Sequence, residues 1–368
     1  MCIYVEKKIE NRDLIFSITN ENEIFEIETE YLHYRKKTNA SPNSIERSAY
    51  SLCYYLRFLE FKGLDIEGVL SFKYKEQHEH FCEFLDFVKA GNHIEGRRAV
   101  RKNVTCNMYL GDVLRFYQYL YLQYENYGEL KVLRDRSMMI HNNMGMRKKV
   151  IGKTFKGYLK NDAVQGDSIS EDNLQRIISA CTNIRDKLII MMFAETGFRI
   201  GELLGIDYLA DIEYENRAVK MKSREDNLNF ARAKYEEDRK GYISEETYKL
   251  LMLYLNRYRK LIEKGTYLFV VIKGKDAGKP LKESAVYSMF MRIEKKTGIK
   301  THPHAIRHYF ATERWKNDWD LLLISNALGH KSIKTTINYL NLESEDLRSA
   351  AEEYYRENDA IKMIEELI

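Results

Sequence analysis

Apolar residues recur at intervals of three and four along most of this 368-residue chain, and only 3 prolines occur in it. Such spacing places apolar side chains on one face of an α-helix, and proline is the residue that helix interiors tolerate least. Apolar residues form 44% of the chain, enough to bury a sizeable core. We therefore expect a mainly α-helical globular protein, long enough for two domains of ordinary size.

The first half of the chain divides into three segments by pattern. Residues 1–22 alternate in character and are too short for a domain, so we expect an N-terminal appendage. Residues 23–127 carry four helical patterns, one of them opened by Ser41 and closed by Gly63, and predict an all-helical bundle. Over 128–167 the periodicity fades and glycine, asparagine, lysine and arginine accumulate, which indicates a basic linker with room for a short helix or strand.

The second half is a larger unit, residues 168–341, followed by a tail, residues 342–368. Ser168 and Glu171 have the spacing of a capping box, which predicts that the first helix begins there. Short alternating pieces between 211 and 244 predict a small antiparallel sheet among helices. The fold class we expect is mainly α with a small antiparallel sheet. We expect the tail, residues 342–368, to form one more helix.

Basic residues are concentrated rather than spread, although the net charge is only +4. A basic band followed by an acidic tail predicts an anionic partner, and nucleic acid is the leading candidate; a solvated surface is the ordinary alternative. Positive side chains in such a band contact DNA phosphates. The residues that we assign to this contact are Arg97, Arg98, Arg101, Lys102, Arg147, Lys148 and Lys149.

The 5 cysteines are isolated from one another, and none has metal-ligand spacing. Such cysteines are typical of reduced core thiols in a cytoplasmic protein. The chain shows neither a signal peptide nor an apolar run of membrane-spanning length, so we expect no membrane association.

Six polar residues of the second unit form the pattern that a phosphate site requires. An arginine and a glutamate lie three positions apart, as do a histidine and an arginine, so each pair shares a helix face. A planar guanidinium gives a phosphate two parallel charge-assisted hydrogen bonds. A later histidine is followed nine positions on by one of the chain's 27 tyrosines. The six residues are Arg199, Glu202, His304, Arg307, His330 and Tyr339.

These motifs resemble the tyrosine recombinase (phage integrase) family, and transposon- or plasmid-borne members in particular. Its first box is matched by residues 196–203, its second by residues 304–308, and its Leu-Gly-His by residues 328–330, with Tyr339 nine residues beyond the histidine. The resemblance implies that residues 23–127 form the helical core-binding domain and residues 168–341 the α+β catalytic domain.

The resemblance also implies the chemistry. Tyr339 attacks a DNA phosphodiester and leaves a 3′-phosphotyrosyl intermediate on the way to a Holliday junction. Of the other residues, Glu202 orients the cluster, His304 assists proton transfer, and the phosphate oxygens are held by Arg199, Arg307 and His330. Because the phosphotyrosine stores the bond energy, the enzyme needs no metal, ATP or other cofactor.

The family's catalytic lysine lies on a sheet turn before an arginine. Lys234 matches that position, with Lys240 and Lys222 as rivals, and it would protonate the leaving oxygen. The proline that usually follows the turn arginine is absent after Arg239, which leaves the strand register open. A metal site at His302, His304 and His308 is disfavoured, since no acid or cysteine lies at ligand spacing.

The partner that the resemblance implies is double-stranded DNA, bound by a homo-tetramer, with accessory DNA-binding proteins as further partners. An apolar stripe on the tail, running from Ala360 to Ile368, would dock onto a neighbouring copy; packing on its own domain is the alternative. Two other functions stay open on this fold. One is DNA relaxation by a type IB topoisomerase-like enzyme, and the other is DNA binding without catalysis.

Overall fold

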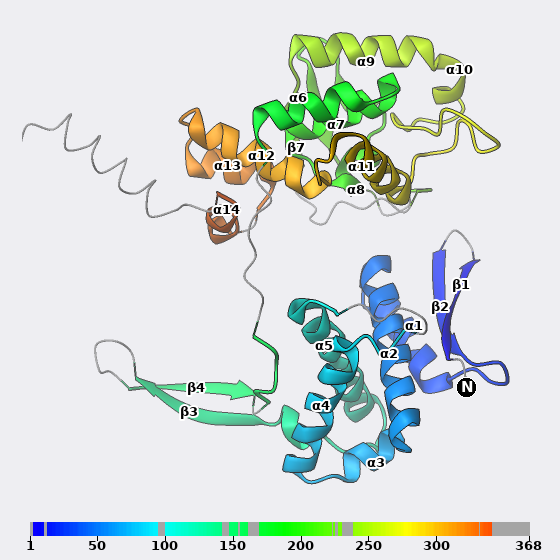
Figure 1. Cartoon of the computed structure of the whole chain (residues 1–368), viewed down its shortest axis with the longest axis vertical. Coiled ribbons are helices and arrows are strands. Elements are labelled where there is room, and N and C mark those ends of the chain that lie inside the picture. The colour runs from blue at the N-terminus through cyan, green and yellow to red at the C-terminus, as the bar shows by residue number, and fades with distance from the viewer. Residues whose placement is uncertain are drawn as a thin grey trace, which may run out of the picture. The chain divides into compact units, whose positions relative to one another are not determined.

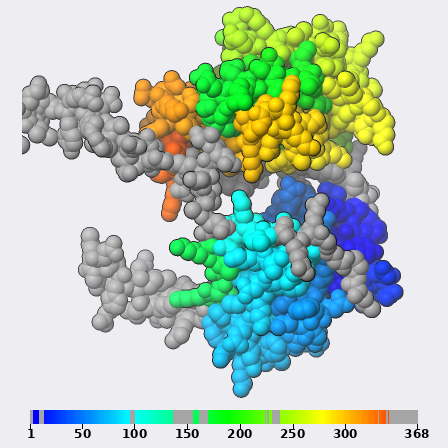
Figure 2. Space-filling view, viewed as in Figure 1, coloured from blue at the N-terminus to red at the C-terminus, as the bar shows by residue number. Residues whose placement is uncertain are grey.

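The protein is described by a computed structural model, which defines residues 3–10, 13–94, 100–141, 147–153, 155–160, 169–222, 224, 227–229, 238–330 and 332–340. The chain divides into two compact units, Met1–Val164 and Gln165–Ile368 (Figure 1). Each unit has a hydrophobic core of its own, and Figure 2 shows one face of the molecular surface. The predicted fold class, mainly helical with small antiparallel sheets, is confirmed.

The core of the first unit is a bundle of helices. Ser41 accepts a hydrogen bond from the backbone of Ser44 at one helix start, and the left-handed Gly63 ends the same helix, as the sequence predicts. At the centre of the bundle, the buried hydroxyl of Tyr55 is shared with His80 and Tyr117, which come from two other helices. The helices are α1 (Glu26–Lys37), α2 (Pro42–Lys62), α3 (Ile66–Ser71), α4 (Tyr74–Lys89) and α5 (Asn103–Gln123).

The N-terminal segment, expected as an appendage, forms a hairpin that joins this core. Strands β1 (Tyr4–Glu10) and β2 (Asp13–Thr19) pair antiparallel. Phe16 and Ile18 are buried with side chains of α1 and α2, since alternate residues of a strand share one face. The residues that looked too few for a domain therefore complete the core of a larger one.

The segment 128–167, expected as a linker, contains a short 3₁₀ helix (Lys131–Leu133) and a second antiparallel hairpin, β3 (Asp135–His141) with β4 (Arg147–Lys153). Both ends of this hairpin are fastened to the first unit. Val132 and Phe155 are buried in its core, and the backbone N–H of Phe155 donates to the carbonyl of Val132 at 3.1 Å. The basic segment therefore continues the first unit over most of its length.

The second unit wraps helices around a three-stranded sheet with the order β5-β6-β7. Its strands are β5 (Ile212–Glu213), β6 (Ala218–Met221) and β7 (Arg239–Tyr242), paired antiparallel as predicted. The helices are α6 (Glu171–Ala180), α7 (Ile184–Thr196), α8 (Ile200–Leu204), α9 (Glu245–Arg257), α10 (Arg259–Ile262), α11 (Glu283–Thr297), α12 (Pro303–Lys316), α13 (Leu321–Leu328) and α14 (Ile333–Leu340).

Helix α7 is the centre of this unit, because it packs against α12, α9 and β7. Helix α6 is capped by Ser170, whose hydroxyl accepts from the backbone N–H of Asn173. The cap predicted from the sequence was Ser168, which lies outside the described residues. Helix α7 ends at Gly197 with φ of 61°, and a Cβ there would lie 2.7 Å from the ring of Phe310 on α12. Only glycine therefore lets α7 stop so close to α12.

A matched pair of glycines tests this close approach. Gly197 and Gly298 both end helices with positive φ, but a Cβ at Gly298 would meet nothing within 4 Å. We expect Gly298→Ala to lower the free energy of unfolding by about 1–2 kcal/mol, the cost of a left-handed residue. Gly197→Ala should cost about 1–3 kcal/mol more, because the site is also overpacked. Both tryptophans, Trp315 and Trp319, belong to the second unit, so their fluorescence in urea reports its unfolding; equal losses would contradict the packing argument.

Candidate active site

The first box forms a tight junction between α7 and α8. The hydroxyl of Thr196 donates to the carbonyl of Met192 at 2.6 Å and accepts from the backbone N–H of Phe198 at 3.3 Å. The chain then enters α8 at once, with Arg199 as its cap, and Glu202 accepts from the backbone N–H of Arg199 at 2.6 Å. This backbone bond, together with the Arg199 guanidinium that donates to the same carboxylate, explains why the two residues stand three positions apart.

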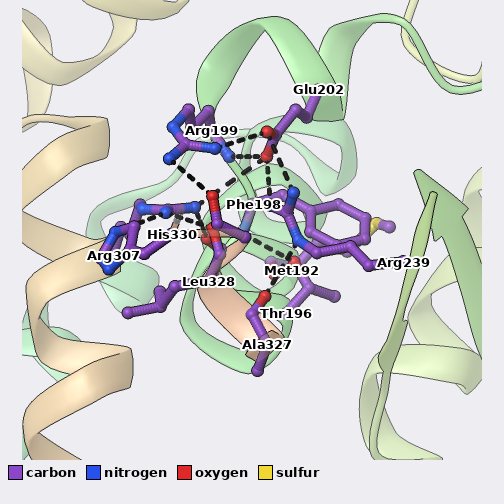
Figure 3. Close-up of polar contacts among 12 residues, drawn as sticks. Met192, Thr196, Phe198, Arg199, Glu202, Arg239, Arg307, Ala327, Leu328 and His330 are labelled. Carbon is purple, nitrogen blue, oxygen red and sulfur yellow. Dashed lines mark hydrogen bonds and ion pairs between the residues drawn. The ribbon is translucent and has the colours of Figure 1, made fainter. Parts of the chain in front are cut away.

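The Glu202 carboxylate is fully buried and lies among three arginines (Figure 3). Arg199 donates to it through Nη1 at 2.9 Å, Arg239 donates through both terminal nitrogens, and Nη1 of Arg307 lies 3.9 Å away. Burial alone would raise the pKa of Glu202, but Arg239, Arg199 and Arg307 outweigh it and lower the pKa. Glu202 is therefore an ionised, orienting group, as the sequence predicts.

The second box lies on α12, which begins with Pro303 at its first turn. Arg307 is 1% exposed and donates to two backbone carbonyls, those of Gly197 and Leu328. Its Nη2 also lies 3.1 Å from Nε2 of His330. The guanidinium thus joins the ends of α7 and α13, which come from distant parts of the sequence.

His330 follows α13 directly, after Gly329 ends that helix with φ of 62°. Because a guanidinium only donates, Nε2 of His330 is the acceptor toward Arg307. The ring proton of the neutral histidine is then on Nδ1, which donates to the hydroxyl of Thr336 on α14 at 2.9 Å. Desolvation, followed by the charges of Arg307 and Arg199, lowers the pKa of His330 to about 3, so the ring is neutral at neutral pH.

His304 lies one turn before Arg307 on α12, and its ring meets the ring of His308 edge-on at 4.8 Å. Although the residue is exposed, partial desolvation of the ring and the positive neighbours His308 and Arg307 lower its pKa to about 4. His304 is thus a neutral base at neutral pH.

The structure places Tyr339 in α14, which packs against α12 and α13; its side chain is outside the described part of the molecule. Lys234 also lies outside the described residues. Of its rivals, Lys240 is paired with Glu213 at 2.8 Å and follows Arg239 on β7. Adjacent strand residues point to opposite faces, so Lys240 points away from the face that reaches Glu202. This geometry argues against Lys240 as the catalytic lysine.

The residue that the sequence analysis missed is Arg239, which it treated only as a landmark after the lysine turn. Arg239 lies on β7, reaches Glu202, and donates through Nε to the carbonyl of Ala327 at 2.9 Å. Its guanidinium also covers the ring of Phe198 at 5.2 Å. The only sequence signal was its place in the lysine–turn–arginine pattern.

Of the residues assigned to DNA phosphates, the structure describes the side chains of two, Arg101 and Lys102. Arg101 is half-buried and Lys102 is exposed at the start of α5. Arg97 and Arg98 lie outside the described residues. Arg147, Lys148 and Lys149 are on β4 of the second hairpin, where only the backbone is described. No helix within the described ranges is both long and apolar enough to cross a membrane.

Comparison with known proteins finds relatives of this chain. The sequence profile described as the Phage integrase family matches residues 167–346. Transposase A from transposon Tn554 of Staphylococcus aureus is 29% identical over 358 residues, covering 94% of this chain and 96% of the transposase. Tyrosine recombinase XerA of Saccharolobus solfataricus is 32% identical over 182 residues, covering 50% of this chain and 54% of that protein.

Solved structures share the fold. The XerH site-specific recombinase bound to a palindromic difH substrate, in a post-cleavage complex, gives a TM-score of 0.58 at 20% identity, covering 90% of this chain and 89% of that one. The Tn1549 transposon integrase in complex with transposon right end DNA gives 0.60 at 18% identity, covering 89% of this chain and 98% of that one. Both alignments extend over both compact units.

The neutral state of His330 is tested by the pH dependence of stability. A histidine in the unfolded chain has a pKa near 6.5, whereas that of His330 in the folded chain is about 3. The unfolded chain therefore binds a proton first, and the free energy of unfolding falls as the pH is lowered from about 6.5 toward 3. His330→Asn should reduce this slope between about pH 6.5 and 5, where carboxylates remain ionised.

Urea unfolding followed by tryptophan fluorescence measures this slope at each pH. The control is His33→Asn, which changes an exposed histidine on α1 of the first unit and should leave the slope as it is. A slope that His330→Asn does not alter would show that His330 has an ordinary pKa in the folded protein.

Proposed function

We propose that this chain, whose residues 167–346 match the Phage integrase family profile, cuts and rejoins DNA at specific sites through Tyr339. The observation that carries the proposal is the convergence of Arg199, Arg307 and His330, from α8, α12 and the end of α13, on one place beside the helix that bears Tyr339. Such a set of donors suits a phosphodiester.

The proposed reaction is a phosphoryl transfer to tyrosine. A bond forms between the Tyr339 oxygen and phosphorus while the bond from phosphorus to the 5′ oxygen breaks, leaving a 3′-phosphotyrosyl linkage. The phenol proton passes to a base, for which we propose His304, and Lys234 gives the 5′ oxygen its proton. A 5′-hydroxyl of a partner strand then attacks phosphorus and releases Tyr339. Two such exchanges form and resolve a Holliday junction.

The backbone contacts of the arginines suggest how the phosphate is received. Arg199 donates to the carbonyl of Gly329 at 3.4 Å, and Arg307 donates to that of Leu328. We propose that the phosphate oxygens take over these donors, because charge-assisted bonds to an anion are stronger than bonds to a carbonyl. The added negative charge would also raise the pKa of His330, so that its Nε2 gains a proton and donates to the phosphate.

DNA is the partner that the relatives support, since solved structures of this fold contain recombinases bound to DNA. Similarity to a transposase over 94% of the chain favours the ends of a mobile element as the substrate. We propose a tetramer on DNA, with residues 342–368, which lie outside the described residues, docked onto a neighbouring copy. The separate helical first unit favours recombination over simple DNA relaxation.

The central prediction concerns the nucleophile. Tyr339→Phe should retain DNA binding but form no covalent adduct, because the phenol oxygen is lost while the phosphate-binding groups remain. Trapping the wild-type protein on DNA, digesting it and sequencing the attached strand identifies both the target and the 3′ linkage. The controls Tyr354→Phe and Tyr355→Phe should form the adduct normally. Persistent cleavage by Tyr339→Phe would place the nucleophile elsewhere.

A second prediction concerns assembly. A chain ending at Glu357 lacks most of the apolar stripe of the tail and should bind a single DNA site as a monomer or dimer without forming a tetramer. Gel mobility and light scattering on DNA with two sites measure the difference. Survival of the tetramer would contradict docking of the tail onto a neighbouring copy.

A further inference from the structure

The end of α13 leaves three consecutive carbonyls without backbone partners inside the helix. The last carbonyls of any helix lack such partners. Here the N–H groups of Gly329 and His330 return to the carbonyls of Asn326 and Ser325, each at 3.0 Å, in the manner of a Schellman motif. The carbonyls that remain to be satisfied are those of Ala327, Leu328 and Gly329.

Each of these three carbonyls accepts from a different arginine (Figure 3). The donors belong to β7, α12 and the start of α8, and they reach the α13 end from three sides. The pairs are Arg239 Nε to Ala327 at 2.9 Å, Arg307 Nη2 to Leu328, and Arg199 Nη2 to Gly329 at 3.4 Å. The segment that presents His330 is thus held by three arginine side chains in addition to its own backbone hydrogen bonds.

The three arginines differ in whether their hydrogen bonds to these carbonyls would be kept when DNA binds. In the proposed function, Arg199 and Arg307 turn their donors to the scissile phosphate and so release Gly329 and Leu328. Arg239 has no phosphate role in any of the recognised boxes. Its bond to Ala327 would therefore be the one that still holds the end of α13 while the phosphate is bound.

The residues around Arg239 pack closely against its side chain and fix its position. Strand β7 lies so close to α7 that a Cβ at Gly241 would be 2.7 Å from Thr196, which brings the strand beside the first box. The guanidinium covers the ring of Phe198, and only 10% of the side chain is exposed. A Cβ at Gly329 would lie 2.6 Å from its Nη1, so the left-handed glycine also makes room for the arginine.

We propose that Arg239 is a positioning residue of the recombination site, which links Glu202 to the carbonyl of Ala327 and thereby fixes His330 relative to Arg199. The proposal rests on the function proposed above. The planar guanidinium donates to the carboxylate through its terminal nitrogens and to the carbonyl through Nε at the same time. A lysine ammonium is a point donor on a flexible chain and would satisfy one of the two partners.

The charge of Arg239 supports the same role. It is the first of the positive neighbours that lower the pKa of Glu202, and it is among those that lower the pKa of His330, after desolvation, Arg307 and Arg199. Removing the charge of Arg239 is therefore expected to raise the pKa of Glu202 and the pKa of His330.

The test compares Arg239→Met, Arg239→Lys and the control Arg259→Met, whose arginine is exposed and pairs with Glu263 on the surface. The substrate is a nicked duplex carrying the sequence recovered from wild-type adducts, and the readouts are DNA affinity and the single-turnover rate of adduct formation. We expect unchanged affinity, a rate about 10- to 100-fold lower for Arg239→Met, an intermediate rate for Arg239→Lys, and the wild-type rate for Arg259→Met.

A second measurement does not depend on activity. Titration of the His330 imidazole by ¹⁵N NMR should give a higher midpoint in Arg239→Met than in wild type, while Arg239→Lys, which keeps the charge, stays near wild type. The titration also applies if the wild-type protein forms no adduct, an outcome that refutes the proposed function alone. The positioning role is overturned if Arg239→Met titrates His330 at the wild-type midpoint or forms the adduct at the wild-type rate. Thermal unfolding of each variant checks that the variant is folded.

Discussion

The buried carboxylate of Glu202 is the interaction on which the rest of the site depends. An unpaired carboxylate in that position would cost several kcal/mol of stability, and three guanidiniums so close together would repel one another. Each charge is therefore tolerated because of the others. The same carboxylate caps α8, so the electrostatic centre of the site is also a fixed point of the backbone. Side chains of α8, α12 and β7 and carbonyls at the ends of α7 and α13 all take part in this polar cluster.

The net charge of this cluster would suit the phosphate of the proposed reaction. With both histidines neutral, three guanidiniums face one carboxylate, which leaves a surplus of positive charge. Backbone carbonyls at the end of α13 accept further hydrogen bonds from these arginines. A phosphodiester has one negative charge and gains more in the transition state, so its stabilisation grows along the reaction. Preorganised donors of this kind lower the barrier without reorganising.

Sequence patterns predicted the helices and singled out six candidate site residues, because both depend on regular spacing. Helix α2 was marked by Ser41 and Gly63, and the boxes by short fixed intervals. The pattern did not predict that the hairpin of Phe16 and Ile18 enters the core, since two alternating strands of seven residues give a weak signal. Nor did it reveal Arg239, whose partners are a distant carboxylate and a backbone carbonyl that exists as a free acceptor only once α13 ends.

Arg239 also bears on the lysine that the structure leaves undescribed. Strand β7 begins with Arg239, five residues after Lys234, so one end of the lysine's segment is fixed to Glu202 and to the end of α13. A general acid must stand within hydrogen-bond reach of the oxygen that it protonates. The same arginine would then position both His330 and the proposed proton donor around one phosphate.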